Sequence, residues 1–269
     1  MLTVIVITKN EQDKLGACLE SVKWADEILI LDNGSIDQTL DIAKKYTSQI
    51  FKFENLDFAS LRNKAIEKAS GEWILYIDAD ERVLENLRRE IEAVINFTDN
   101  SAFAISRRNI VFGTELNYGP FWPDWVIRLF KKSDFENWVG KIHEQPKFKG
   151  SLGYMENSFL HLTHRSLEQI VLKSLEWSKI EAQLRLDINH PKMSGLRFLR
   201  IFISEIFNQG IKRRGFFNGT IGVMDSLLQA FSMFMTYIRL WQLQQTKPLE
   251  KTYAEIDEEL IKNQFKIKA

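Results

Sequence analysis

Short, continuous apolar runs alternate with helical patterns through the first hundred residues. The runs are LTVIVIT (residues 2–8), EILILD (27–32), IFKF (50–53) and EWILYID (72–78). Helical patterns cover residues 11–22, 35–46, 57–69 and 85–95, with Ser35 as the expected cap of the second. Strands that are apolar throughout are buried on both faces, and helices in the crossovers cover them. The alternation predicts an α/β fold, a mixed and mostly parallel sheet flanked by helices.

The sequence changes character after the fourth apolar run. Residues 101–164 contain short strand patterns separated by aromatic loops such as YGPFWPDW, and they are expected to extend the sheet. From Ser166 onward the pattern is helical and closes with the charged segment LEKTYAEIDEELIKNQF. We therefore expect two parts, residues 1–165 and a helical extension over residues 166–269.

Charge balance and cysteine content exclude some classes of protein. The 269 residues include 36 Lys and Arg against 36 Asp and Glu, so the net charge is zero, which argues against a nucleic-acid partner. The single cysteine, Cys18, excludes an intramolecular disulfide, and its setting LGACLESV predicts the buried face of a helix. The N-terminus lacks the basic start and cleavage site of a signal peptide. We expect a cytoplasmic protein.

Three carboxylates end the fourth apolar run, in the sequence WILYIDADERV. Asp78, Asp80 and Glu81 lie where ligands bind in parallel sheets, at the carboxyl end of a strand. Without a partner these groups repel one another. A divalent cation, Mg²⁺ or Mn²⁺, removes the repulsion because such ions prefer oxygen ligands, and it would in turn bind phosphate oxygens. The cluster therefore predicts a metal and phosphate site.

A series of spaced motifs resembles the inverting, nucleotide-sugar-dependent glycosyltransferases of family 2, which have the GT-A fold. The motifs are VIVITKNEQDKLGACLESV, ILILDNGSIDQT, FASLRNKAIEKASGEWILYIDADE, WPDWVIRLFKK, WVGKIHE and RRGFFNGTIG. The last three resemble the bacterial branch that includes lipopolysaccharide inner-core glucosyltransferases. The resemblance implies a nucleotide-sugar-binding half at residues 1–100 and an acceptor-side half at residues 101–165. It also implies a nucleotide-sugar donor, first guess UDP-glucose, and a saccharide or lipid-linked saccharide acceptor in lipopolysaccharide core or other cell-envelope glycan synthesis.

This sequence departs from the family pattern at two positions. The usual acidic-acidic or acidic-serine pair after the second strand is Asp32-Asn33 here, and the usual Ser-Thr-Asp is Ser35-Ile36-Asp37. Both changes fall at the edge of the expected nucleotide site. They therefore bear on the choice of nucleotide and sugar more than on the fold.

The resemblance assigns the donor side residue by residue. The residues expected to contact the nucleotide sugar are Thr8, Asn10, Glu11, Asp32, Arg62, Asp78 and Asp80. Asp80 is expected to hold the metal on the diphosphate, together with His161 or, alternatively, His164. Three simpler interpretations stay open. Asp32 could only form a turn that caps a helix, and Arg62 could only pair with nearby acids on a helical surface. His161 could be a satisfied core residue of its apolar strand.

The other half is expected to supply the base and the acceptor contacts. Glu144 matches the glutamate of a His-Glu pair in this branch and is nominated as the catalytic base. His143 is expected to line the acceptor pocket. Trp125 and Arg128 are the further acceptor-side candidates, because aromatic faces stack on sugar rings and a guanidinium grips phosphate or carboxylate. A tryptophan-rich core turn would explain the same loop.

The helical part suggests contact with a membrane or with another copy of the chain. Residues 191–215 carry six basic residues and one acidic residue beside an apolar helical face. Peripheral binding to the inner membrane or self-association would each use this pattern. A helix packed on the catalytic domain with a solvated basic edge would show it equally. The run FFNGTIGVMDSLLQAFSMFMTYI is long enough to span a bilayer, but Asp225 within it argues against insertion.

Alternatives from other classes carry their own requirements. A glycosyltransferase acting on a peptide or protein would share the same donor site. A sugar-phosphate nucleotidylyltransferase needs a glycine-rich loop after the first strand, whereas the first glycine there is Gly16. A non-catalytic saccharide-binding module would leave the acidic cluster inert. The motifs favour the glycosyltransferase.

Overall fold

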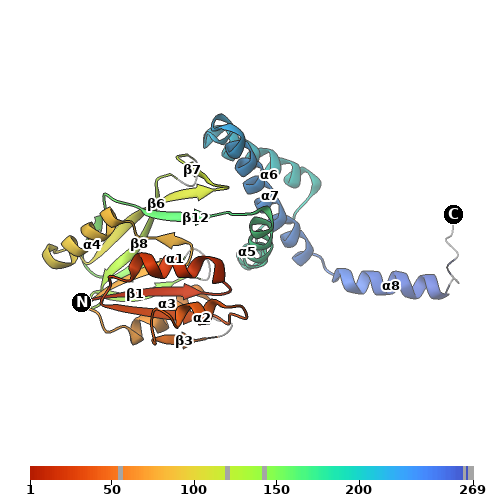
Figure 1. Cartoon of the computed structure of the whole chain (residues 1–269). Helices are drawn as coiled ribbons and strands as arrows, with labels where there is room; N and C mark the ends of the chain where they lie inside the picture. The colour runs from red at the N-terminus through yellow and green to blue at the C-terminus, as the bar shows by residue number, and fades with distance from the viewer. Residues whose placement is uncertain (54–56, 119–121, 141–143, 263–264, 266–269) are drawn as a thin grey trace. The chain divides into compact units, whose positions relative to one another are not determined.

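The structure, a computed structural model, describes residues 1–53, 57–118, 122–140, 144–262 and 265, except the side chain of Phe58. Its contacts divide the chain into two compact units, Met1–Arg165 and Ser166–Ala269. The first unit contains the strands, and the second contains helices (Figure 1).

The apolar runs form the parallel half of the central sheet. Their order is β3-β2-β1-β4, and every pairing among them is parallel. The strands are β1 (Leu2–Thr8), β2 (Glu27–Asp32), β3 (Ile50–Lys52) and β4 (Trp73–Asp78). All residues of β1 and β2 are buried, as expected for strands covered on both faces. The predicted α/β architecture is confirmed.

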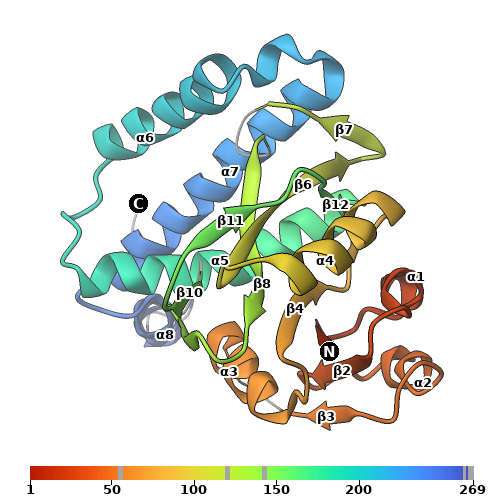
Figure 2. The ribbon, with the colours of Figure 1, turned by 90° about the vertical axis from the view of Figure 1, so that its left-hand side faces the viewer.

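The second half of the sheet continues from β4 in the order β8-β6-β12-β5. β8 runs antiparallel to both β4 and β6, so the sheet is mixed. Two short strands, β7 and β11, also pair with β6, and β9 with β10 forms a separate two-stranded sheet (Figure 2). The bounds are β5 (Glu81–Arg82), β6 (Ala102–Val111), β7 (Thr114–Leu116), β8 (Asp124–Lys131), β9 (Phe135–Val139), β10 (Gln145–Phe148), β11 (Leu152–Tyr154) and β12 (Phe159–Thr163).

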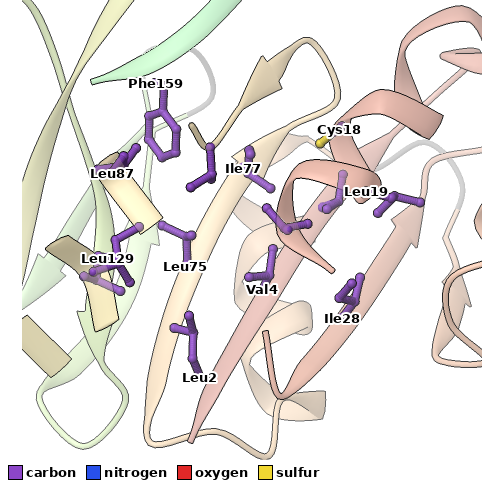
Figure 3. Packing of buried hydrophobic residues seen from close by; sticks show 14 of the residues in the cluster. Leu2, Val4, Cys18, Leu19, Ile28, Leu75, Ile77, Leu87, Leu129 and Phe159 are labelled. Atoms are coloured by element: carbon purple, nitrogen blue, oxygen red, sulfur yellow. The ribbon is translucent and has the colours of Figure 1, made fainter. Parts of the chain in front are cut away.

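Helices cover both faces of this sheet. They are α1 (Gln12–Val22), α2 (Thr39–Ala43), α3 (Phe58–Lys68) and α4 (Glu85–Phe97). On one face, Leu19 of α1 and Leu87 of α4 pack in a cluster with Val4 and Leu75 (Figure 3). On the other face, Leu61 of α3 joins a second cluster. Cys18 is fully buried on α1, which confirms the prediction of a structural cysteine.

The predicted cap at Ser35 is wrong. Helix α2 begins at Thr39, and residues 33–36 form a loop instead. The Ser35 hydroxyl accepts from the Asn10 backbone N–H at 2.9 Å, while the Ser35 backbone N–H donates to Asp32 at 3.0 Å. Gln38 occupies the cap position and makes no side-chain capping bond, while Asp37 before it accepts from the Thr39 N–H at 3.0 Å. Ser35 therefore joins the loops after β1 and β2.

The second unit is an assembly of helices. They are α5 (Leu167–Asp187), α6 (Gly195–Phe207), α7 (Gly219–Leu243) and α8 (Leu249–Lys262), with a π-helical turn at Asn208–Lys212 and a 3₁₀ turn at Gly215–Phe217. Both α5 and α6 pack against α7. By length and composition α7 is apolar enough to cross a membrane, with 33% of its most apolar window buried inside the protein. It also carries the buried Asp225.

Candidate active site

Three adjacent parallel strands place Thr8, Asp32 and Asp78 at one edge of the sheet. Thr8 lies opposite Asp32, and Ile7 lies opposite Asp78 in the pairing of β1 with β2 and β4. Ligands of open α/β sheets bind at this edge, beyond the carboxyl ends of the strands. The polar residues predicted at the three strand ends therefore lie together.

Asp32 forms a turn and also keeps one oxygen uncommitted. Its Oδ2 accepts from the backbone N–H groups of Gly34 at 3.2 Å and Ser35 at 3.0 Å, which is the turn that the simpler interpretation expected. Its Oδ1 and the hydroxyl of Thr8 are buried and have no hydrogen-bond partner among the described residues. Buried polar atoms are normally paired. Two such atoms on neighbouring strands suit a polar ligand.

Asn10 and Glu11 hold the loops at this edge together. The Asn10 side chain accepts from the Ile36 N–H at 2.9 Å, and the Glu11 N–H donates to the Thr39 hydroxyl at 2.8 Å. The Glu11 carboxylate pairs with Lys14 at 2.6 Å. Burial raises the pKa of Glu11, and Lys14 opposes that shift. Ile36, where the family usually has threonine, is 93% exposed.

Asp78 is held by two buried guanidinium groups. Arg62 Nη2 lies 3.1 Å from Asp78 Oδ1, and Arg128 Nη2 lies 2.6 Å from Asp78 Oδ2. Burial alone would raise the pKa of Asp78, but Arg128 and Arg62 hold it well below its usual range. Asp78 is therefore a paired carboxylate.

Arg62 also binds Glu144, the predicted base. Its Nη1 lies 2.9 Å from Glu144 Oε1, so one guanidinium bridges two carboxylates. The guanidinium stacks 4.8 Å from the Trp138 ring, and the Tyr76 hydroxyl donates to the Arg62 carbonyl at 2.8 Å. Burial, and then Arg128, lower the pKa of Arg62. Arg62 therefore pairs with acids, as the simpler interpretation expected, but it does so as a buried residue and not on a helical surface.

A bulge in β8 directs Arg128. Leu129 pairs with Phe103 and Ile127 pairs with Ala104, so Arg128 has no opposite residue on β6. Bulges re-aim side chains and are common beside active sites. The structure places this predicted acceptor-side residue, only 6% exposed, on Asp78.

Asp80, in the turn between β4 and β5, lies close to His161 of β12. His161 lies opposite Glu81 in the pairing of β12 with β5, and its Nε2 is 3.4 Å from Asp80 Oδ2. Among the described residues no group of three or more His, Cys, Asp or Glu could hold a metal ion. Mg²⁺-type ions are often bound by one or two carboxylates while substrate phosphates and water supply the other ligands. Asp80 fits the role of such a carboxylate, and the imidazole of His161 lies next to it as a candidate further ligand.

The other sequence candidates lie in varied settings. Trp125 is 42% exposed and meets Tyr154 edge-on, with ring centroids 5.2 Å apart. His164 follows β12, and its carbonyl accepts from the Phe112 N–H at 3.2 Å. His143 lies outside the described residues.

Comparison with known proteins decides the family. The family described as Glycosyl transferase family 2 matches residues 3–152, more than half of the chain. The chain belongs to glycosyltransferase family 2. It is similar to the lipopolysaccharide core biosynthesis glycosyltransferase LpsC of Rhizobium meliloti, at 26% identity over 90% of this chain and 92% of LpsC. An uncharacterized glycosyltransferase of Rickettsia typhi is 27% identical over 90% of this chain and 87% of its own length.

A third relative of this family 2 member matches over a shorter region. The SPbeta prophage-derived glycosyltransferase SunS of Bacillus subtilis is 34% identical over 71% of this chain and 47% of SunS. Family membership makes the chain a nucleotide-sugar-dependent glycosyltransferase with the GT-A fold, as the motifs implied. Nucleotidyl transfer and a non-catalytic saccharide module are thereby set aside.

In this glycosyltransferase, the sequence reasoning missed two residues of the polar network that contacts His161 of the Asp80–His161 pair. Arg107 and Asn109 lie on β6, and they connect His161 to Asp124 and Glu81. The available signal was the segment SRRNI, in which Arg107 and Asn109 occupy alternate positions and therefore the same face of a strand. Polar residues on the inner face of a covered strand need partners.

Proposed function

We propose that this glycosyltransferase moves a hexose, with UDP-glucose as the first donor to test, to a saccharide of the cell envelope such as the lipopolysaccharide core. The reaction proposed is inverting and depends on Mn²⁺ or Mg²⁺. The similarity to LpsC supports the acceptor class. The observation that carries the proposal is the pairing of Asp80, which follows β4, with His161 of β12. The oxygens of Thr8 and Asp32 that lack a partner among the described residues support it.

On the donor side, each residue has a proposed task. Asp32 Oδ1 and the Thr8 hydroxyl receive the nucleoside, because both are buried at the strand ends and have no hydrogen-bond partner within the part of the chain that the structure describes. Asp80 and His161 would hold the divalent cation. When bound, the cation supplies Lewis-acid stabilisation of the leaving nucleoside diphosphate. Asn10 and Glu11 keep the loops around this site in place.

On the reacting side, inversion requires a base that takes the proton of the acceptor hydroxyl as it attacks the anomeric carbon. Glu144 is proposed as that base. Arg62 binds the Glu144 carboxylate at Oε1 and also binds Asp78. One guanidinium therefore connects the proposed base to the donor site. The side chain of Glu144 is 17% exposed, which leaves it accessible to an acceptor.

Acceptor recognition is proposed for the exposed aromatic surface of β8 and β11. Trp125 and Tyr154 offer two rings that a sugar can stack on. Arg128 supports this side indirectly, since its guanidinium pairs with Asp78. His143 remains an acceptor-side prediction from the sequence. A peptide or protein acceptor is the alternative, and it would use the same donor site.

Two measurements test the proposal. A thermal-shift series with UDP, with and without Mn²⁺, tests donor binding; ligand at a hundredfold its Kd should add about 2.7 kcal/mol. A panel of nucleotide sugars, assayed for Mn²⁺-dependent hydrolysis, then identifies the donor. Stabilisation by UDP that is equal in Mn²⁺ and in EDTA would contradict the cation assignment.

We further propose that the second unit contacts the cytoplasmic face of the inner membrane. Exposed apolar residues recur at helical spacing along α6, namely Leu196, Leu199, Ile203 and Phe207. A second exposed apolar series follows on α7, namely Val223, Met224, Leu227 and Phe231. Exposed basic residues accompany them, namely Lys192, Arg200, Lys212, Arg213 and Arg214. Apolar and basic groups together favour anionic lipid surfaces.

Vesicle co-sedimentation tests the membrane contact. The full chain should sediment with phosphatidylglycerol-containing vesicles and much less with phosphatidylcholine alone. Ile203→Ser with Phe207→Ser should weaken binding, whereas the control Leu172→Ser, an exposed leucine on α5, should not. A dimer in solution that the same double substitution dissociates would assign this surface to self-association instead.

A further inference from the structure

Polar side chains from four adjacent strands of the sheet, β8, β6, β12 and β5, form one connected network. Three direct cross-strand pairs connect them: Asp124 opposite Arg107, Asn109 opposite His161, and His161 opposite Glu81. Asn109 and Glu81 are completely buried. Strand register therefore fixes which side chains meet.

Hydrogen bonds follow the same path. Arg107 Nε donates to Asp124 Oδ2 at 2.8 Å, and its Nη1 lies 3.5 Å from Glu81 Oε1. Asn109 Nδ2 donates to Asp124 Oδ2 at 3.0 Å. Asn109 Oδ1 lies 2.5 Å from His161 Nδ1. Burial works against the charge of Arg107, but Glu81 and Asp124 hold the pKa of Arg107 above its ordinary value.

The orientation of the Asn109 amide follows from Asp124. A carboxylate paired with a guanidinium accepts hydrogen bonds and has no proton to donate. It must therefore face the NH₂ group of Asn109, since the flipped amide would place two acceptors 3.0 Å apart. The carbonyl oxygen is then the atom that faces His161. Because that oxygen can only accept, the facing nitrogen, Nδ1, must carry the proton.

We propose that Asn109 is a positioning residue that holds His161 in the tautomer protonated on Nδ1. The Nε2 lone pair then faces Asp80 and is available to a cation, a use that rests on the proposed function. A ring nitrogen can bind a metal only when it is unprotonated, and the hydrogen bond made by the other nitrogen selects the tautomer.

The competing arrangement shows what Asn109 prevents. With its proton on Nε2, His161 would donate to Asp80 and occupy both side chains of the pair. The Nε2–Oδ2 separation of 3.4 Å exceeds the usual 2.7–3.2 Å range of an N–H···O bond. The short contact lies on the Nδ1 side, at Asn109. Asn109 therefore disfavours the tautomer in which His161 Nε2 donates a hydrogen bond to Asp80.

Nitrogen-15 NMR of the metal-free, full-length wild-type protein at pH 8 tests the tautomer directly. The chain has four histidines, and the resonances missing from His161→Gln assign His161. Nδ1 is expected at the shift of a protonated ring nitrogen and Nε2 at that of an unprotonated one. The reverse pattern would overturn the proposal, and this measurement needs no substitution at Asn109.

Asn109→Leu tests the cause, because leucine keeps the approximate size and removes the acceptor. The Nδ1-protonated tautomer should lose its dominance, and Mn²⁺ affinity measured with UDP present should fall about 10- to 100-fold. The control Arg108→Leu removes an exposed pair with Glu115 from the neighbouring position and should change neither. An unchanged tautomer in Asn109→Leu would refute the role of Asn109. A shifted tautomer with unchanged Mn²⁺ affinity would support the role of Asn109 and contradict the metal role of His161.

Discussion

Arg62→Met should destabilise the first unit by about 3–5 kcal/mol, the range for breaking a buried ion pair by removing one partner. Arg62 is 2% exposed, and its guanidinium lies 2.9 Å from Glu144 and 3.1 Å from Asp78. Methionine fills much of the same space beside Trp138. The cost therefore comes from the carboxylates, because Asp78 loses one of its two guanidinium partners among the described residues and Glu144 loses its contact with Arg62.

Arg88→Met is a matched control on α4. Arg88 also pairs with a carboxylate, Glu92 at 3.0 Å, and lies over an aromatic ring, Trp24 at 5.4 Å. Its side chain is 39% exposed, so solvent screens the pair and the substitution should cost no more than about 1 kcal/mol. The comparison therefore isolates the effect of burial.

Urea unfolding monitored by tryptophan fluorescence provides the measurement. Adding Glu144→Gln to Arg62→Met should recover part of the loss, because the double variant no longer carries an unpaired Glu144 carboxylate. The two substitutions are then non-additive, as expected for residues in one network. Equal losses of unfolding free energy for Arg62→Met and Arg88→Met would refute the argument that burial makes the ion pairs of Arg62 costly to break.

Four further substitutions address the donor site, the base, the acceptor surface and the second unit. Asp80→Asn should remove the Mn²⁺-dependent thermal shift by UDP while the ligand-free protein unfolds as before; normal Mn²⁺-dependent turnover would reject its metal role. Glu144→Gln should retain UDP binding and lose transfer, and intact transfer would place the base elsewhere. Trp125→Ala should raise the acceptor KM about tenfold, roughly 1.4 kcal/mol of stacking, with donor KM as the internal control. Asp225→Asn should stabilise the protein at pH 7.5 by about 2–3 kcal/mol, because burial raises the pKa of Asp225 from 3.8 to about 6. Because this pKa is higher in the folded protein, the stability contributed by protonated Asp225 is fully present below about pH 4 and is lost as the pH rises through 6. An equal gain in unfolding free energy from Asp225→Asn at pH 4 and at pH 7.5 would contradict the raised pKa.

The parallel half of the sheet was predictable because its information is local. The runs of β1, β2 and β4 are apolar on both faces, whereas β3 is shorter and none of its residues is buried. Each run is followed by a helical pattern, so strand identity follows from adjacent residues. The order β8-β6-β12-β5 was not predictable in the same way. It depends on pairings between segments far apart in sequence, and β5 has only two residues, Glu81 and Arg82.

The residues of the candidate site also divide into those that local sequence predicts and those that depend on strand pairing. Polar residues at the ends of β1, β2 and β4 were found from sequence because the chain itself places them at one edge. The partners of the acidic turn were not, since Arg107 and Asn109 belong to a distant strand and Arg128 is directed by a bulge. A bulge is a property of two paired strands, and neither strand alone encodes it.

The two aspartates of the turn are not interchangeable. Asp78 continues the face of β4 that carries Tyr76, next to Arg62 of α3, and two guanidinium groups already satisfy its charge. A cation at Asp78 would be repelled by both. Asp80 instead faces an imidazole, whose lone pair adds a ligand without adding an opposing charge. The structure thus separates a carboxylate that anchors Arg62 and Glu144 from one that can accept a divalent ion, although only a single residue lies between them.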